Sequence, residues 1–162
     1  MKTSAPIQSA VRIVEVGPRD GLQNVKTTIA TATKRDLILR LADAGHTTIE
    51  LTSMVSPKAV PQLSDGKALL QDTAIQELLR QKRIRLPVLV PNLKGLTAAV
   101  GAGVSEVAVF VSATEGFSRA NINATVDEAL LRVNSVCEAA ALSCVLVRGL
   151  GVLLLANTLR RD

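Results

Sequence analysis

The sequence is nearly without aromatic residues, with no Trp, no Tyr and two Phe in 162 residues. Domains that bind single-stranded nucleic acid commonly stack bases on aromatic rings, so this shortage argues against that class. The apolar residues make up 48% of the chain and are mostly Ala, Val, Leu and Ile. Small and β-branched side chains of this kind suit a parallel β-sheet that is covered by helices.

Cysteine and histidine are also scarce, with two residues of the first type and one of the second. Cys137 and Cys144 do not make a disulfide framework, and we expect two reduced, mostly buried thiols. His46 precedes a predicted strand, which would place it at the N-terminal edge of the sheet. In enzymes built on parallel strands and helices, such as (β/α)8 barrels, the chemistry lies at the opposite, C-terminal edge. A metal-binding role for His46 is therefore not expected.

Acidic residues are outnumbered by basic ones, 14 against 19, which gives a formal net charge of +5. The basic residues are scattered, and their densest group, residues 80–85, lies where a helix should end and where cations interact favourably with the helix dipole. We therefore predict no nucleic-acid partner.

No apolar run is long enough to span a membrane, and residues 1–10 do not resemble a signal peptide. We expect a cytoplasmic protein or a mitochondrial matrix protein, with the cytoplasm slightly favoured.

Apolar, β-rich runs alternate with helical patterns along the chain. The patterns predict five strands, at residues 11–16, 47–52, 86–90, 106–111 and 143–147, with helices at 32–44, 66–81, 93–102 and 125–141. Strands separated by helices pair in parallel through right-handed crossovers, so that all their C-terminal ends lie at one rim. No linker is visible, and residues 1–162 are predicted to form a single domain.

Two architectures are consistent with this order, a doubly wound sheet and a barrel. No Gly-x-Gly-x-x-Gly follows the first predicted strand, which weakens the dinucleotide-binding version of the doubly wound sheet. A (β/α)8 TIM barrel needs about 250 residues, so 162 residues would supply about its first five β/α units. We predict an α/β fold that is an incomplete (β/α)8 TIM barrel, with residues 150–162 as an atypical tail.

Polar residues follow the predicted strands, where the rim should lie. Arg19 and Asp20 come after the first strand, and Glu50 and Ser53 end the second. An Asp can bind a hard cation such as Mg²⁺, and an Arg oriented by a Glu can stabilise negative charge on a substrate oxygen. The spacing is equally consistent with a turn at Asp20-Gly21 and a structural ion pair between Arg19 and Glu50.

Four segments carry a resemblance to a known family: Val14-Glu-Val-Gly-Pro-Arg-Asp-Gly-Leu-Gln-Asn24, Ile49-Glu-Leu-Thr-Ser-Met-Val-Ser-Pro-Lys58 with Val60-Pro-Gln62, Pro91-Asn-Leu-Lys-Gly95, and Glu115-Gly-Phe-Ser-Arg-Ala-Asn-Ile-Asn123. They resemble, in order, the 3-hydroxy-3-methylglutaryl-CoA (HMG-CoA) lyases. The related branch that condenses acetyl-CoA with 2-oxo acids is the alternative. Its members usually open with Asp-Thr-Leu-Arg-Asp-Gly, whereas Val16-Gly-Pro-Arg-Asp-Gly21 favours the lyases.

The resemblance implies a TIM barrel that cleaves HMG-CoA to acetyl-CoA and acetoacetate, a retro-Claisen cleavage assisted by Mg²⁺ or Mn²⁺. By position, it makes Asp20 the metal ligand. Arg19 would then contact the thioester carbonyl and stabilise the enolate, while Glu50 would hold Arg19. Ser53 is a weaker candidate for substrate contact. The resemblance implies an acyl-CoA substrate, and we also expect a homo-oligomer or self-association.

The sequence departs from the family in its second half. The family completes its metal site with a His-x-His pair and an Asn from later strands, and it carries a reactive Cys on a glycine-rich loop. None of these can be placed here, since Cys137 belongs to a predicted helix and Cys144 to the start of a strand. After Gly149 the resemblance ends. We therefore expect a truncated or frame-shifted product that is inactive alone; the alternative is a non-catalytic fragment that docks on a full-length subunit.

Overall fold

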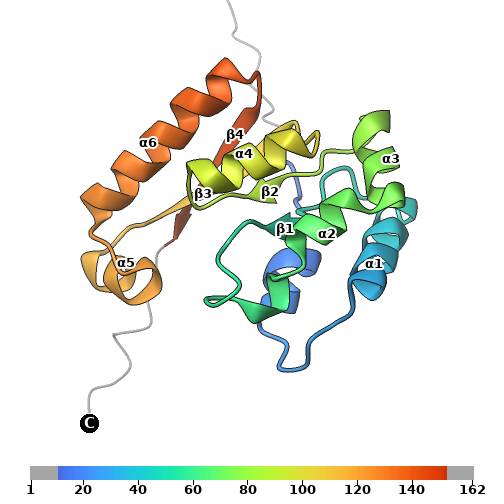
Figure 1. The fold of residues 1–162 in the computed structure, drawn as a ribbon, viewed down its shortest axis with the longest axis horizontal. Helices are drawn as coiled ribbons and strands as arrows, with labels where there is room; N and C mark the ends of the chain where they lie inside the picture. Colours follow the sequence, from blue (N-terminus) through green and yellow to red (C-terminus); the bar gives the residue numbers. More distant parts are fainter. Residues whose placement is uncertain (1–10, 153–162) are drawn as a thin grey trace, which may run out of the picture.

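The computed structural model describes residues 11–152, in which helices cover one face of a parallel sheet (Figure 1). In chain order, the elements are the turn η1 (Gly17–Gly21), helix α1 (Thr31–Asp43), strand β1 (Thr52–Ser53), the 3-10 turn η2 (Pro61–Leu63), helices α2 (Gly66–Gln71) and α3 (Thr73–Gln81), strand β2 (Val88–Leu89), helix α4 (Leu93–Gly101), strand β3 (Glu106–Ser112), helices α5 (Glu115–Ile122) and α6 (Val126–Leu142), and strand β4 (Leu146–Val152).

Every strand of the sheet pairs in parallel with the next strand in the chain, in the order β1-β2-β3-β4. Isolated parallel bridges at Glu15↔Ile49 and Thr48↔Arg85 extend the same arrangement towards the N-terminus. A doubly wound sheet reverses its strand order at a switch point, whereas a barrel keeps consecutive strands adjacent. The observed order is therefore that of a barrel.

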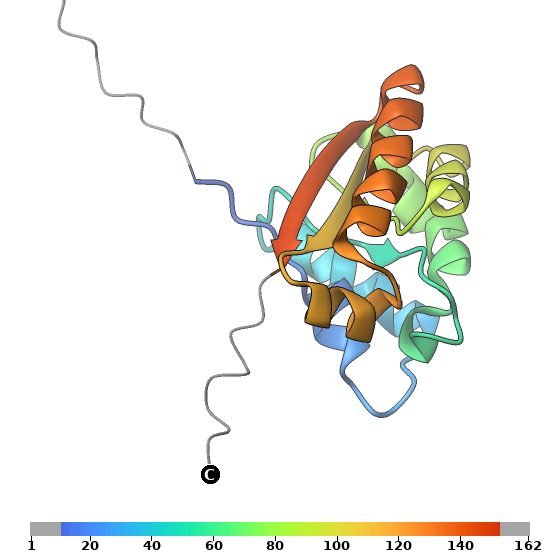
Figure 2. The ribbon, with the colours of Figure 1, turned by 90° about the vertical axis from the view of Figure 1, so that its left-hand side faces the viewer.

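The apolar core lies between the helices and one face of the sheet. Figure 2 shows α4 and α6 on the same side of β3 and β4. Val88 and Val107 supply the core from the sheet, and neither is exposed. The helices meet them with a fully or nearly fully buried set of residues: Ile38, Leu69, Leu70, Ile75, Leu96, Ala99, Val136 and Ala140. The other face of the sheet carries the polar residues of the rim.

The face of the sheet opposite the helices, which carries Glu50 and Arg148 and is called the polar face below, is concave. Ser53, Leu89, Ala108 and Arg148 form one row across the four strands. In a flat sheet, three strand spacings would separate the ends of this row by about 14 Å. Arg148 nevertheless bonds through its side chain to Glu50, which lies just before β1. Because side chains stand roughly perpendicular to a sheet, this contact indicates that the sheet curves towards this face, as part of a TIM barrel does. The predicted α/β fold with parallel, consecutive strands is confirmed.

The first two predicted strands are shorter than expected. The predicted strand at 11–16 is reduced to the bridge at Glu15, and Val11 and Ile13 are 92% and 75% exposed. Within the second predicted strand and just after it, regular pairing is limited to β1 and to the single bridges made by Thr48 and Ile49. One reason is Pro87 on the neighbouring strand, which accepts a hydrogen bond from the Leu51 amide but has no N–H to return.

The predicted helices agree with the structure more closely than the predicted strands do, with two exceptions. Residues 66–81 form two helices because Asp72 adopts an extended conformation and caps α3, accepting from the amides of Ala74 and Ile75. Helix α5 was not predicted from the sequence, and its N-terminus is capped by Thr114 at the Phe117 amide. For α6, the predicted cap at Thr125 is present.

The fifth predicted strand, at 143–147, is shifted, since β4 runs from Leu146 to Val152. The shift arises at Cys144, whose φ of 53° lies in the left-handed region and turns the chain before the strand.

The expectation of mostly buried thiols was wrong for Cys144, which is exposed, while Cys137 is half-buried; both are free. The predicted domain and tail extend to residues 1–10 and 153–162, which lie outside the described residues. Within residues 11–152, no helix is long and apolar enough to cross a membrane.

Candidate active site at the C-terminal rim

Arg19 and Asp20 are presented by η1, a wide turn at the C-terminal end of the first strand segment. The amides of Arg19, Asp20 and Gly21 all donate to the carbonyl oxygen of Val16, at 3.1, 2.7 and 3.3 Å. Bonds from i+3, i+4 and i+5 to one acceptor wind the chain more widely than an α-helix, a geometry that is frequent at functional sites. The turn and α5 lie at the end of the sheet to which the β4 arrow points (Figure 2).

Glu50 is the centre of a buried cluster of charges. Its side chain is fully buried; Oε1 accepts from Arg19 Nε at 2.5 Å, and Oε2 accepts from Arg148 Nη2. Arg19 Nη1 also donates to Asp20 Oδ1 at 2.7 Å. Two guanidinium groups therefore face two carboxylates, which satisfies the requirement that a buried carboxylate be paired and hydrogen-bonded.

The expected contact between Arg19 and Glu50 is present, and it fixes the Arg19 side chain, which is 12% exposed. Its Nε and Nη1 atoms are engaged, whereas Nη2 has no hydrogen-bond partner among residues 11–152. Arg19 is thus held from one side and keeps donor capacity on the other. That arrangement suits a group that stabilises charge on a bound oxygen.

Ser53 reaches the polar face through a β-bulge. The Leu51 amide donates to Pro87 O and the Met54 amide to Leu89 O, so three residue steps on one strand match two on the next. Strict alternation would place residues 50 and 53 on opposite faces, but the extra residue brings both to the same face. The Ser53 side chain is nevertheless 2% exposed, and its Oγ accepts from the Val55 amide at 3.2 Å.

Asp20 is the exposed member of the cluster, with 55% of its side chain accessible. Oδ1 is shared with Arg19, and Oδ2 has no hydrogen-bond partner among the described residues. An exposed carboxylate oxygen at the rim fits a hard cation. Within residues 11–152, no group of three or more His, Cys, Asp and Glu side chains lies close enough together to hold a metal.

Arg148 belongs to the site but was not predicted from the sequence. It lies on β4, beyond the predicted end of the fifth strand, and it is paired in register with Ala108. A signal was present, because Arg148 is the one charged residue in the apolar run from Val145 to Val152. A lone charge that is only 24% exposed requires an opposite charge on the same face. Glu50 provides it.

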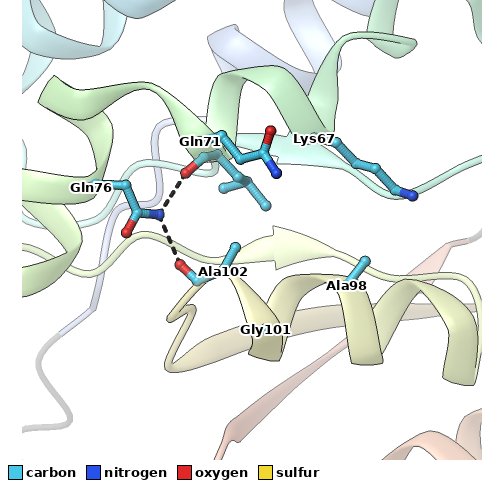
Figure 3. A pocket seen from close by; sticks show the side chains of 7 residues that line it. Lys67, Gln71, Gln76, Ala98, Gly101 and Ala102 are labelled. Atoms are coloured by element: carbon cyan, nitrogen blue, oxygen red, sulfur yellow. Dashed lines mark hydrogen bonds between the residues drawn. The ribbon is translucent and has the colours of Figure 1, made fainter.

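A cavity of about 440 Å³ lies elsewhere, between α2, α3 and α4 (Figure 3). Gln76 spans part of it, with Nε2 donating to Leu70 O at 2.6 Å and to Ala102 O at 2.9 Å. The cavity adjoins the C-terminal ends of α2 and α4, which lie opposite the rim because helices run antiparallel to the strands that they connect. None of Arg19, Asp20 and Glu50 lines it.

A curved parallel sheet with charged side chains gathered at its C-terminal rim is the architecture of TIM-barrel enzymes. The family model described as HMGL-like matches residues 10–145, and the chain belongs to this family.

Among curated relatives, the chain is 53% identical over 148 residues to the mitochondrial hydroxymethylglutaryl-CoA lyase of Arabidopsis thaliana, covering 91% of this chain and 31% of that one. It is 48% identical over 139 residues to the mitochondrial enzyme of Homo sapiens, covering 86% and 41%. The chain thus spans less than half the length of these relatives.

Solved structures give the same result. The HMG-CoA lyase of Brucella melitensis superimposes with a TM-score of 0.80 at 48% identity, covering 87% of this chain and 48% of that one. An HMG-CoA lyase of Acinetobacter baumannii, solved with coenzyme A and 3-methylmalate, gives a TM-score of 0.78 at 34% identity, covering 86% and 44%.

Proposed function

We propose that residues 11–149 supply one part of the active site of a lyase that cleaves HMG-CoA to acetyl-CoA and acetoacetate. The observation that carries the proposal is Arg19, held by Glu50 and Asp20 at the C-terminal rim with Nη2 uncommitted among the described residues. Relatives named as HMG-CoA lyases support the choice of reaction. The acyl-CoA substrate is part of this proposal, as is a cytoplasmic or mitochondrial location.

In the proposed reaction, the proton of the 3-hydroxyl group passes to a base, the bond between C2 and C3 of the substrate breaks, and the resulting enolate takes up a proton at C2 to give acetyl-CoA. The electron pair of that bond passes to the thioester, so negative charge develops on the thioester oxygen. A fixed guanidinium donor beside this oxygen stabilises the charge as it forms. Arg19 takes this role, and Glu50 keeps its guanidinium in place. Arg148 holds the second oxygen of Glu50 and so positions Arg19 indirectly.

Asp20 is the proposed ligand of Mg²⁺ or Mn²⁺, which when bound would polarise the hydroxyl and carbonyl oxygens of the substrate. A hard cation takes about six oxygen ligands, and Asp20 provides one exposed carboxylate. We therefore infer that further protein ligands come from outside residues 11–152, and that the 162-residue chain does not cleave HMG-CoA on its own.

Ser53 is the least supported of the proposed residues. The bulge brings it to the face of Glu50, which agrees with a place beside the substrate, but its hydroxyl is buried and already accepts a hydrogen bond. Its proposed role is a substrate contact.

The test uses the 162-residue chain alone and co-expressed with the part of the Brucella melitensis lyase that it does not match. Both samples receive Mn²⁺ and HMG-CoA, and acetoacetate is followed. We expect none from the chain alone and metal-dependent product from the complex, lost in Asp20→Ala. Product from the chain alone would contradict the ligand count, and a soluble complex without product would contradict the proposed reaction.

A non-catalytic docking fragment is the second candidate, and one observation favours it. The outer edge of β4 has no partner strand among the described residues, so it is available to another chain. In the same co-expression experiment, this candidate predicts a stable complex that never forms acetoacetate.

A further inference from the structure

Lys34 is a buried cation that the proposed chemistry does not use. It lies in the first turn of α1, where a lysine ordinarily reaches solvent, yet its side chain is 3% exposed. Nζ donates to the backbone carbonyl of Gln62 at 2.5 Å and to Asp65 Oδ1 at 2.6 Å. Burial of an ammonium group is unfavourable unless it is paired and hydrogen-bonded, so these two contacts determine where the side chain lies.

Asp65 is committed to Lys34 instead of to its own helix. It occupies the N-cap position of α2, where an Asp side chain usually accepts from the backbone amides of the first turn. Here the carboxylate makes no capping bond. Oδ2 accepts from the Thr31 hydroxyl at 2.7 Å, and Oδ1 accepts from Lys34. The loss of a favourable local cap indicates that the tertiary contact with α1 outweighs it.

The contacts of Lys34 continue to the rim. Gln62, whose carbonyl binds Lys34, donates from its side-chain amide to the carbonyl of Val25 at 3.0 Å. Next to Val25 in the chain, Asn24 donates from its side chain to the carbonyl of Asp20 at 3.2 Å. One hydrogen-bonded path therefore joins α1, the loop after β1 and the loop after η1, and it ends at the backbone of Asp20.

We propose that Lys34 is a positioning residue, which acts through Asp65 and Gln62 to hold the loop that carries Asp20 at the rim. This inference rests on the proposed function only for the role of Asp20 as a metal ligand. The mechanical part, that Lys34 couples residues 54–65 to residues 18–30, stands on the contacts alone. Removal of the ammonium group frees both loops together and leaves β3 and α6 unchanged, because neither element contributes to the path.

Hydrogen exchange of the full 162-residue chain tests the mechanical part. In Lys34→Met, peptides from residues 18–30 and 54–65 are expected to exchange about tenfold faster, since the two hydrogen bonds of the charged group, to Gln62 and Asp65, are lost at the start of the path. Lys34→Arg should restore most of the protection. Asp65→Asn, which keeps the shape of the side chain, should affect the same two regions. Lys67→Met, an exposed lysine of α2, is the matched control.

Unchanged exchange in both loops, or an equal increase in β3 and α6, would overturn the coupling. The functional part is read from the co-expressed complex with the Brucella melitensis segment. Lys34→Met should raise the Mn²⁺ concentration for half-maximal activity about tenfold while the KM for HMG-CoA changes less than about twofold. Equal changes in the two constants would show a general loss of structure. If the complex has no activity, the proposed function fails, and the exchange result still decides whether Lys34 couples the loops.

Discussion

Glu50 and Arg148 lie 98 residues apart in the sequence and bond across the concave face of the sheet. The other oxygen of the same carboxylate accepts from Arg19. One buried residue therefore ties the turn after the first strand segment to the last described strand. The same contact that shows the curvature of the sheet also fixes the proposed charge-stabilising group.

Loss of the Glu50 charge should destabilise the fold strongly. In Glu50→Gln, Arg148 would lose its negative partner and Arg19 would keep only Asp20, although their side chains are just 24% and 12% exposed. Removing one member of a buried ion pair typically costs about 3–5 kcal/mol. We expect a decrease of about 3 kcal/mol in the free energy of unfolding, measured by urea denaturation.

The matched control for Glu50→Gln is Glu138→Gln on the exposed side of α6. A surface substitution of this kind should stay within about 0.5 kcal/mol of the wild type. A loss under about 1 kcal/mol for Glu50→Gln would mean that the two arginines find other partners, and it would contradict the central place of Glu50.

The N-terminus of α6 should lose stability in acid. The amide of Thr125 donates to Glu128 Oε2 at 2.8 Å, and this bond lowers the pKa of Glu128 below its ordinary value of 4.5. A carboxyl whose pKa is lowered by folding stabilises the protein above its unfolded pKa, and the contribution disappears as the pH falls through the folded pKa.

This dependence can be isolated by comparison of the wild type with Glu128→Gln, whose amide can still accept the bond but carries no charge. Thermal unfolding followed by circular dichroism from pH 7 to pH 3 should show the wild type as the more stable protein near neutrality. The difference should begin to shrink as the pH falls below the ordinary value of 4.5, and it should vanish once the pH lies below the lowered pKa of Glu128. A difference that is constant across this range would assign the stabilisation to something other than the charge.

The outer edge of β4 should mediate self-association. The Leu146 amide donates to Ser105 O, so the amides of even-numbered residues face β3, and Val147, Gly149 and Gly151 direct theirs outward. Unpaired edges of this kind recruit other strands. Gly149→Pro removes one outward N–H and leaves the bonds to β3 in place, and it should lower the mean mass seen by light scattering.

Gly149→Ala is the control for this experiment, because it keeps the N–H, and among the described residues no atom beyond the two chain neighbours lies within 4 Å of the added methyl group. It should associate like the wild type. A monomeric wild-type chain with a cooperative melt would contradict the open-edge account, and equal association of the Pro and Ala variants would place the contact elsewhere.

Features specified by local pattern were predicted from the sequence, whereas features that depend on strand pairing were missed. Hydrophobic periodicity located α1, α4 and α6 to within one or two residues, since an amphipathic helix is largely specified by its own residues. The alternation of elements also led to a parallel, barrel-like order. The shortening around Pro87 and the bulge that brings Ser53 to the polar face arise from neighbouring strands, which local pattern does not report.

The candidate site divides in the same way. The positions of Arg19, Asp20 and Glu50 were predicted from strand ends and from the family resemblance, and their catalytic roles stay predictions. Arg148 was missed because the strand that carries it begins later than its apolar pattern indicated, after the left-handed turn at Cys144. A buried charge network of this kind depends on which side chains the fold brings together, and it becomes visible only in three dimensions.

The most direct test of the central claim is the turnover of a chimera in which residues 11–149 replace the matched part of the Brucella melitensis lyase. The account predicts Mn²⁺-dependent release of acetoacetate from HMG-CoA. Arg19→Gln should reduce kcat by about a hundred- to a thousandfold without loss of the folded state, because a charge-stabilising donor is removed. Arg132→Gln, an exposed arginine of α6, should leave kcat unchanged. A folded chimera without activity, or one whose turnover survives Arg19→Gln, would contradict the account.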